Sequence, residues 1–279
     1  MKKLVIGIVL IFVLVFMAAC APSASTLKPA IGERPVSSGQ TGQQAAEKEG
    51  RVVFTITDAA ADMGAVTKVM LTVDDVQVHS ETEGWVTVSS TPTTVDLLKL
   101  KAEGSQELLA DAKLKEGDYQ HLRLDISKIV VVDAAGEHEA KLPSGELKFV
   151  GGFTVTENSI STAKFDFVAD ESLHTTGKGE YILAPVVQLE TRENADVVIK
   201  ADEKVEVKNG NVKTNTKVGM DIDGKVGVGV SIAKNAKLSL KSGKVALETA
   251  ASLGLTTEKK TSSEDNASAS LGVKVKVGY

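Results

Sequence analysis

The chain has 279 residues, of which 42% are hydrophobic, 25% charged and 4% aromatic, and its formal net charge is −5. That length is enough for one or two globular domains. Residues 195–279 are rich in lysine but contain no arginine and a single aromatic residue. Nucleic-acid binding relies on arginine forks and stacked aromatic rings, so we expect no nucleic-acid partner.

The N-terminus has the pattern of a signal peptide. Lys2 and Lys3 precede a run from Leu4 to Ala19 that is almost wholly apolar. The run is short for a membrane-spanning helix, which needs about 20 residues, but it suits the core of a signal peptide. We therefore expect residues 1–19 to direct export and then to be removed.

The only cysteine of the chain, Cys20, directly follows this run. The stretch Met17-Ala18-Ala19-Cys20 resembles the lipobox of prokaryotic lipoproteins, with Met17 where leucine is more usual. We expect Cys20 to carry the lipid, because small residues admit the peptidase and two acyl chains anchor a protein stably. The protein would then be an exported, membrane-anchored lipoprotein facing outside the cytoplasm. The alternatives are an uncleaved signal anchor and an ordinary secreted protein cut near Ala19.

Residues 20–50 combine the lipidated cysteine with a predicted flexible tether. The segment is rich in Ser, Pro, Gly, Gln and Ala and has almost no large apolar residue. It cannot bury enough surface to offset the entropy of ordering, so we expect no fixed structure. About 30 flexible residues reach roughly 30 Å, which would hold the folded part clear of a lipid surface.

Residues 51–192 predict an all-β domain. Apolar residues alternate with polar ones in most segments, and the alternation slips by one residue at 74–75, which indicates a bulge. One segment, 96–114, looks helical and would cross one end of the domain. The fold class that this pattern favours is an antiparallel β-sandwich with one short helical crossover. The expected strands are 53–57, 66–80, 84–90, 119–133, 136–142, 151–157, 161–170 and 181–190.

A family resemblance covers about half of the chain, roughly residues 52–188. The motifs ITDAAADMGAVTKVMLTVDDVQVH, GWVTV, VDLLKL, LADAKLKEGDYQHLRLDI, FTVTENSISTAKFDFVADESL and YILAPVV occur in this order. Together they resemble domain of unknown function 4382, although Ala60 stands where the family usually has proline. The resemblance implies an exported, often lipidated, β-domain of bacteria and archaea, with no established reaction.

Residues 193–279 predict a lysine-rich antiparallel β-meander. Two-residue turns are expected at 209–210 and 242–243, and a three-residue loop at 223–225, because Asn-Gly, Ser-Gly and Asp-Gly pairs favour such turns. The last segment, LGVKVKVGY, resembles the terminal strand of outer-membrane barrels. Strands embedded in a membrane barrel are therefore an alternative for this tail, although it lacks the aromatic girdles of such barrels.

Few residues suggest chemistry. Asp58, Asp62 and Asp166 are weak candidates for a metal site, but no calcium-binding loop is present. Asp58 also fits an Asx turn at the end of a strand, and Asp166 is expected to face solvent. No cofactor is predicted, since neither a zinc-type histidine spacing nor a nucleophile elbow occurs. Asn266 begins an Asn-X-Ser sequence, which matters only in a host that glycosylates exported proteins.

The sequence thus favours a lipid-anchored cell-surface protein with a non-catalytic binding or envelope-structural role. Its partners would be the membrane through the lipid, and a surface glycan or another envelope protein. An envelope enzyme or cation-dependent module that uses the carboxylates of the sandwich stays open as an alternative.

Overall fold

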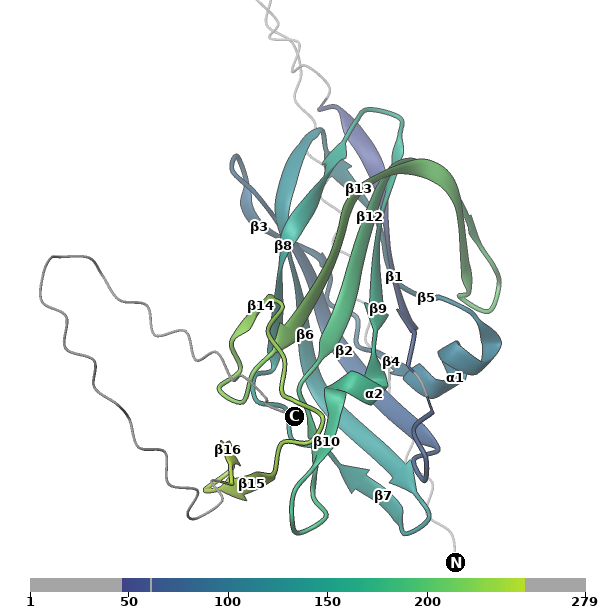
Figure 1. The fold of residues 1–279 in the computed structure, drawn as a ribbon. Coiled ribbons are helices and arrows are strands. Elements are labelled where there is room, and N and C mark those ends of the chain that lie inside the picture. Colours follow the sequence, from purple (N-terminus) through teal and green to yellow (C-terminus); the bar gives the residue numbers. More distant parts are fainter. Residues whose placement is uncertain (1–46, 61, 249–279) are drawn as a thin grey trace, which may run out of the picture. The chain divides into compact units, whose positions relative to one another are not determined.

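The computed structural model describes residues 47–60 and 62–248. They form sixteen strands and two short helices (Figure 1). The elements in chain order are β1 (Glu49–Asp58), β2 (Lys68–Ser80), β3 (Gly84–Ser89), β4 (Thr93–Asp96), α1 (Leu97–Glu103), β5 (Glu107–Lys115), β6 (Gly117–Asp133), β7 (Gly136–Glu139), β8 (Glu146–Val155), β9 (Ile160–Phe167), α2 (Ala169–Ser172), β10 (Leu173–Thr175), β11 (Tyr181–Leu183), β12 (Val186–Ile199), β13 (Val205–Met220), β14 (Val226–Val228), β15 (Leu238–Lys241) and β16 (Lys244–Leu247).

Two sheets make the main body. The first has the strand order β14-β13-β12-β9-β1-β5, and the second has the order β3-β2-β6-β7, with β4 also paired to β2 and β8 to β6. Phenylalanines from the two sheets meet between them: the ring centroids of Phe54 and Phe153 are 6.1 Å apart, and those of Phe149 and Phe165 are 5.1 Å apart. The predicted all-β sandwich is therefore confirmed, and its core is the apolar layer between the sheets.

One strand pair departs from the expected antiparallel pattern. β1 runs parallel to β9, with Val53 beside Thr162 and Ile56 beside Phe165. The two strands are far apart in sequence, and the chain passes through the whole second sheet between them, so no tight turn forces them to be antiparallel. The other pairings between named strands are antiparallel.

The predicted helical crossover is confirmed, but it is shorter than expected. α1 carries the chain from β4 in the second sheet to β5 in the first. Asp96 caps its start by accepting a hydrogen bond from the Lys99 amide, and Gly104 ends it in the left-handed region at φ 59°. The expectation of helix over the rest of 96–114 is wrong, because residues 107–115 pair with β1 and bury Leu109 and Leu114.

The turn predicted at 209–210 is also wrong, although its backbone has the expected left-handed character. Asn209 and Gly210 have φ angles of 56° and 79°, yet they lie inside β13, opposite Asn194 of β12, which has φ 54°. At this point the long β12–β13 hairpin bends over in an arch (Figure 1). These three left-handed residues face one another across the two strands, so the strands bend sharply while their pairing continues on both sides.

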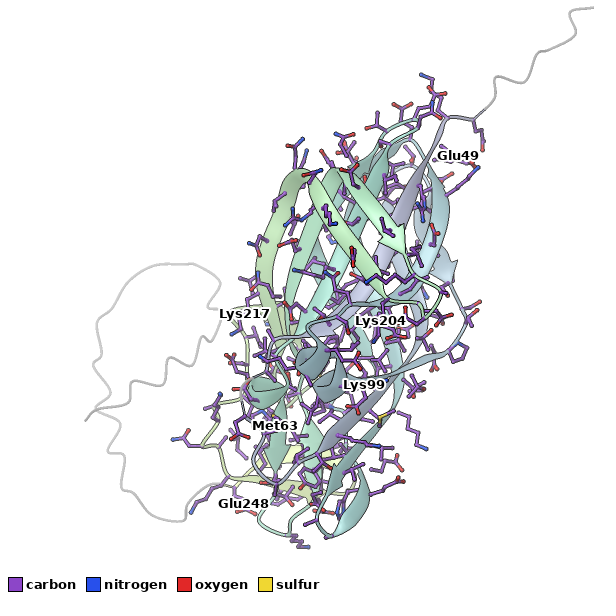
Figure 2. All side chains as sticks on the ribbon, turned by 90° about the vertical axis from the view of Figure 1, so that its right-hand side faces the viewer. Glu49, Met63, Lys99, Lys204, Lys217 and Glu248 are labelled. Atoms are coloured by element: carbon purple, nitrogen blue, oxygen red, sulfur yellow. The ribbon has the colours of Figure 1, made fainter. Side chains whose placement is uncertain are left out.

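The tip of this hairpin covers the outer edge of β5. The Leu108 amide donates to the Glu203 carbonyl at 3.0 Å, and the Val205 amide donates to the Gln106 carbonyl at 2.9 Å. The ammonium group of Lys204, which lies beside α1 (Figure 2), is 3.1 Å from Glu103 and 3.0 Å from Glu107. The arch therefore covers the start of β5, which shortens the free edge of the first sheet that would otherwise invite aggregation.

Of the remaining tail strands, β14 extends the first sheet, whereas β15 and β16 form a small sheet of their own. β14 pairs with β13, and Met220 faces Val226. The connecting loop therefore has five residues, 221–225, and the predicted three-residue loop at 223–225 is wrong. The turn predicted at 242–243 is confirmed and joins β15 to β16. Residue 192, the predicted end of the sandwich domain, lies within β12. Single bridges link residue 141 to β11 and residue 176 to β15.

Candidate functional site

The outer face of the second sheet carries the most distinctive group of exposed side chains. Register places Trp85, His79, His121 and Val150 in one row across β3, β2, β6 and β8. The next row holds Thr87, Gln77, Arg123 and Lys148, and a third holds Asp75, Asp125 and Glu146. We call these three rows the Trp85 face.

Each strand contributes to this face through simple alternation. In β2 and β6 the neighbouring residues Val78, Leu122 and Leu124 point inward and are fully buried. A residue out of phase with them must point outward. Trp85 follows the same rule, since it precedes the half-buried Val86 on β3. The large aromatic side chain is therefore held on the solvent side by the pattern of the strand itself.

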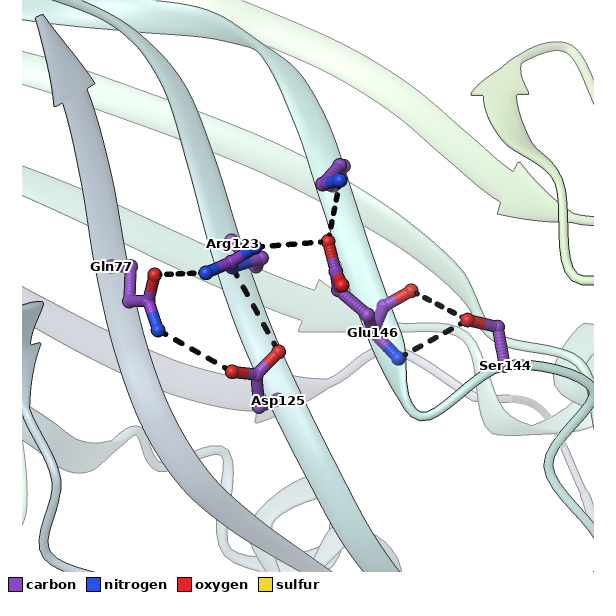
Figure 3. A network of polar contacts seen from close by, with 6 residues as sticks. Gln77, Arg123, Asp125, Ser144 and Glu146 are labelled. Carbon is purple, nitrogen blue, oxygen red and sulfur yellow. Dashed lines mark hydrogen bonds and ion pairs between the residues drawn. The ribbon is translucent and has the colours of Figure 1, made fainter. Parts of the chain in front are cut away.

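Arg123 lies at the centre of the face and connects its neighbours (Figure 3). It donates one hydrogen bond to Glu146 Oε1 at 3.2 Å and another to the side-chain oxygen of Gln77. Gln77 in turn donates to Asp125 Oδ2 at 3.4 Å, and Lys148 pairs with Glu146 at 2.7 Å. The network spans three strands and fixes the planar ends of these side chains relative to one another.

Trp85 is the single tryptophan of the chain, and 40% of its surface is exposed. The guanidinium carbon of Arg123 lies 4.7 Å from the centroid of the indole ring, a cation–π contact. The His79 ring meets the indole edge-on, with centroids 5.2 Å apart. Arg123 and His79 thus hold the ring in place while leaving a large part of it open to solvent.

The charges of the face are compensated unevenly. The Lys148 hydrogen bond lowers the pKa of Glu146. Burial raises the pKa of Asp125, and the nearby carboxylates of Glu146 and Asp75 raise it further, against the attraction of Arg123. The Arg123 end of the face is therefore balanced, whereas the Asp125 end is acidic.

Asp58 does form the predicted Asx turn at the end of β1. Its Oδ1 accepts the Ala60 amide at 3.1 Å, and it also accepts the Ala169 amide at 3.0 Å, a long-range contact that the sequence did not suggest. The residue is only 4% exposed, and its Oδ2 has no hydrogen-bond partner. Burial raises the pKa of Asp58 to about 6, although both amide hydrogen bonds oppose the rise.

Asp166 lies on β9, beside Thr57 of β1, and so comes close to Asp58. It is half-buried rather than solvent-facing as expected, and its Oδ1 has no hydrogen-bond partner. Burial raises the pKa of Asp166, while the Lys164 charge lowers it. Lys101, which donates to the Ala59 carbonyl at 3.2 Å, adds positive charge near both carboxylates.

Asp62 does not join this pair by any contact that the structure records. Its Oδ1 accepts the Gly64 amide at 2.8 Å in a local turn. Within the part of the chain that the structure describes, no three His, Cys, Asp or Glu side chains gather as metal ligands would. Asp166 thus influences Asp58 electrostatically, but the register of β1 and β9 puts the two residues one position out of phase.

Several predicted features fall on residues that the structure does not describe. These are the signal peptide, Cys20, the tether up to residue 46, Asn266 and the last predicted strand. Among residues 47–60 and 62–248, no helix is long and apolar enough to cross a membrane.

Trp85 and Arg123 were not among the site residues predicted from the sequence. A signal for Trp85 was present, since the one tryptophan of the chain stands at a polar-phase position of an alternating strand. Nothing in the sequence placed Arg123 over its ring, because the two residues are 38 positions apart and meet only through the pairing of β2 with both β3 and β6.

The sandwich and its open polar face define the class as an all-β domain with a flat, surface-exposed candidate binding site. A family model described as a domain of unknown function (DUF4382) matches residues 49–185 and confirms the predicted resemblance. No curated protein and no solved structure matches the chain. The family match ends just before β12, so the strands that complete the first sheet lie beyond it.

Proposed function

We propose that the chain is an exported, lipid-anchored cell-surface protein that binds an envelope component through the Trp85 face. The observation that carries the binding role is the half-exposed indole of Trp85, held by Arg123 within a hydrogen-bonded network. A large aromatic side chain that is exposed and fixed contributes strongly to binding, because little freedom remains to be lost on association.

The face suits binding better than catalysis. It is the open surface of a sheet, and its polar groups already hydrogen-bond to one another. Proton transfer or nucleophilic attack needs a group positioned against a bound substrate, usually where water is excluded. A rigid, open arrangement instead offers shape and hydrogen-bond partners to a ligand.

The anchoring part of the proposal rests on the N-terminal sequence. The apolar run, the stretch 17–20 and the polar segment up to residue 50 together support a lipid on Cys20 and a spacer after it. Such a spacer would let the sandwich reach ligands on the cell surface.

Intact mass of the membrane-fraction protein tests the anchor. We expect the loss of residues 1–19 together with added acyl mass, and the acyl mass should be absent in Cys20→Ser. An unprocessed chain without acyl mass would contradict the anchor.

Co-sedimentation of the full chain with isolated envelope fragments tests the binding role. Trp85→Ala should reduce binding by at least about tenfold, a loss of about 1.4 kcal/mol. Val198→Ala is the matched control, because it trims another exposed apolar side chain, 54% exposed, on a strand of the first sheet. Equal binding by the two variants would contradict the proposed face.

A further inference from the structure

We propose that the ligand of the Trp85 face is an uncharged polysaccharide, a sugar ring stacking on Trp85 while its hydroxyl groups hydrogen-bond to the Arg123 network. This inference rests on the proposed binding function and names the chemical class that the same site would take. Three features of the face lead to it: the geometry of the indole, the type of polar group beside it, and the balance of charge.

The first feature is the open part of the indole. Arg123 lies over the indole ring, and 40% of the Trp85 surface stays exposed to solvent. The C–H groups on one side of a sugar ring form a flat apolar patch with partial positive charge. Such a patch packs favourably on the negative face of an aromatic ring.

The second feature is the set of planar polar groups beside the ring. The side chains of Arg123, Asp125 and Glu146 are 21%, 31% and 36% exposed, so a ligand can reach them. A carboxylate accepts several hydrogen bonds, and a guanidinium donates up to five. Neighbouring hydroxyl groups of a sugar both donate and accept, so they match this alternation of fixed donors and acceptors.

The third feature is charge. Arg123 and Lys148 both pair with Glu146, and with Asp125 and Asp75 the face carries three carboxylates against these two cations. Asp75 faces Asp125 across the strands, which makes that end of the face repel anions. A ligand without charge avoids this repulsion.

The composition of the face also favours a glycan over a protein partner. The centre of a protein–protein interface is depleted in lysine, aspartate and glutamate, although arginine is common there. Here the neighbours of Trp85 in the next two rows are Gln77, Arg123, Asp125 and Glu146. The four-strand row from Trp85 to Val150 extends about 14 Å, at about 4.8 Å per strand, which is longer than one sugar ring.

Fluorescence of the full chain tests the ligand directly, because Trp85 is the only tryptophan of the chain, so the signal that remains after subtracting the fragments alone reports on this site. Protection of the indole from acrylamide quenching would be measured with envelope fragments that are untreated, digested with protease or oxidised with periodate, which cleaves neighbouring hydroxyl-bearing carbons. A neutral glucan and polygalacturonate serve as defined probes of charge.

We expect the fragments to protect Trp85 before and after protease digestion, at low and at raised salt, and to lose this effect after periodate. Protection lost with protease would identify a protein ligand and overturn the inference while leaving the binding function intact. Protection by polygalacturonate but not by uncharged glycans, or protection abolished by raised salt, would overturn the uncharged class. No protection by untreated fragments would overturn the proposed function itself.

Variants separate the stacking from the hydrogen bonds. Trp85→Phe keeps an aromatic face and should retain most of the binding, whereas Trp85→Ala should lose at least about tenfold in co-sedimentation. Arg123→Lys keeps the charge but loses the fork, and a loss of about tenfold is expected. Thermal unfolding of each variant, with Val198→Ala as the control, establishes that it is folded. Undiminished binding by folded Trp85→Ala or Arg123→Lys would refute the stacking or the hydrogen-bonding part, respectively.

Discussion

Replacement of Asp58 by asparagine tests how much the buried carboxylate at the end of β1 lowers the free energy of unfolding. Asparagine keeps a side-chain oxygen that can accept the amides of Ala60 and Ala169, but it carries no charge at any pH. The oxygen that becomes the amide nitrogen, Oδ2, has no hydrogen-bond partner to lose. The substitution therefore removes the charge with little change in the contacts.

The expected magnitude follows from the pKa. Burial raises the pKa of Asp58 to about 6 in the folded state, whereas an aspartate in an unfolded chain has a pKa of about 3.9. The folded state thus binds the proton more tightly, so the stability linked to this group is fully present below about pH 3.9 and is lost as the pH rises to about 6. The shift in pKa between the unfolded and folded states corresponds to at most about 3 kcal/mol of stability. Because nearby water screens the charge, we expect about 1–3 kcal/mol.

Urea unfolding of the parent and of Asp58→Asn between about pH 4 and pH 8 measures the effect. The free energies of unfolding should nearly agree at about pH 4, diverge to about 1–3 kcal/mol in favour of the variant by about pH 6, and stay apart above it. Comparison at each pH cancels the titration of the other carboxylates. Asp62→Asn makes the same chemical change at an exposed turn and is the matched control. A difference independent of pH, or one that favours the parent at pH 7, would refute the reasoning.

Three other substitutions test the arch and one polar cluster. Gly210→Val should lower the free energy of unfolding by at least about 2 kcal/mol, because Gly210 has φ +79° and an added Cβ would lie 2.9 Å from the Glu193 carbonyl oxygen; urea unfolding measures it. Lys204→Met should cost about 1–2 kcal/mol and speed hydrogen exchange at the hairpin tip, since it removes the ammonium group that pairs with Glu103 and Glu107. Tyr181→Phe should raise the pKa of Asp133 above about 2, because the tyrosine hydroxyl is its strongest hydrogen-bond donor; an NMR titration follows it.

Matched variants control these three experiments. Gly179→Val has a similar backbone, φ +82°, with nothing within 4 Å of an added Cβ, so the difference from Gly210→Val isolates the clash. Lys208→Met removes a lysine from the exposed part of β13, and Tyr119→Phe removes a hydroxyl that donates to a backbone carbonyl. Equal effects of each variant and its control would mean that the contacts described here do not matter.

Local patterns predicted the strands that rely on their own alternation. β2 and β6 were expected from residues that alternate between the core and solvent, and the slip at 74–75 is indeed an irregularity in their pairing. The hairpin between β6 and β7 and the turn at 242–243 were also predicted, because they depend on two or three residues whose backbone preferences are local. The Asx turn of Asp58 belongs to the same group.

Tertiary structure decided the features in which distant segments compete for a residue. Residues 107–115 have leucines that fit either a helix or a strand, and the open edge of β1 selects the strand. Asn209-Gly210 favours a turn by itself, but here β12 pairs with β13 on both sides of it, so the same left-handed backbone becomes the bend of an arch. The Trp85 face likewise exists only after four strands align, because register between strands is set by the packing of the whole sandwich and not by any one of their sequences.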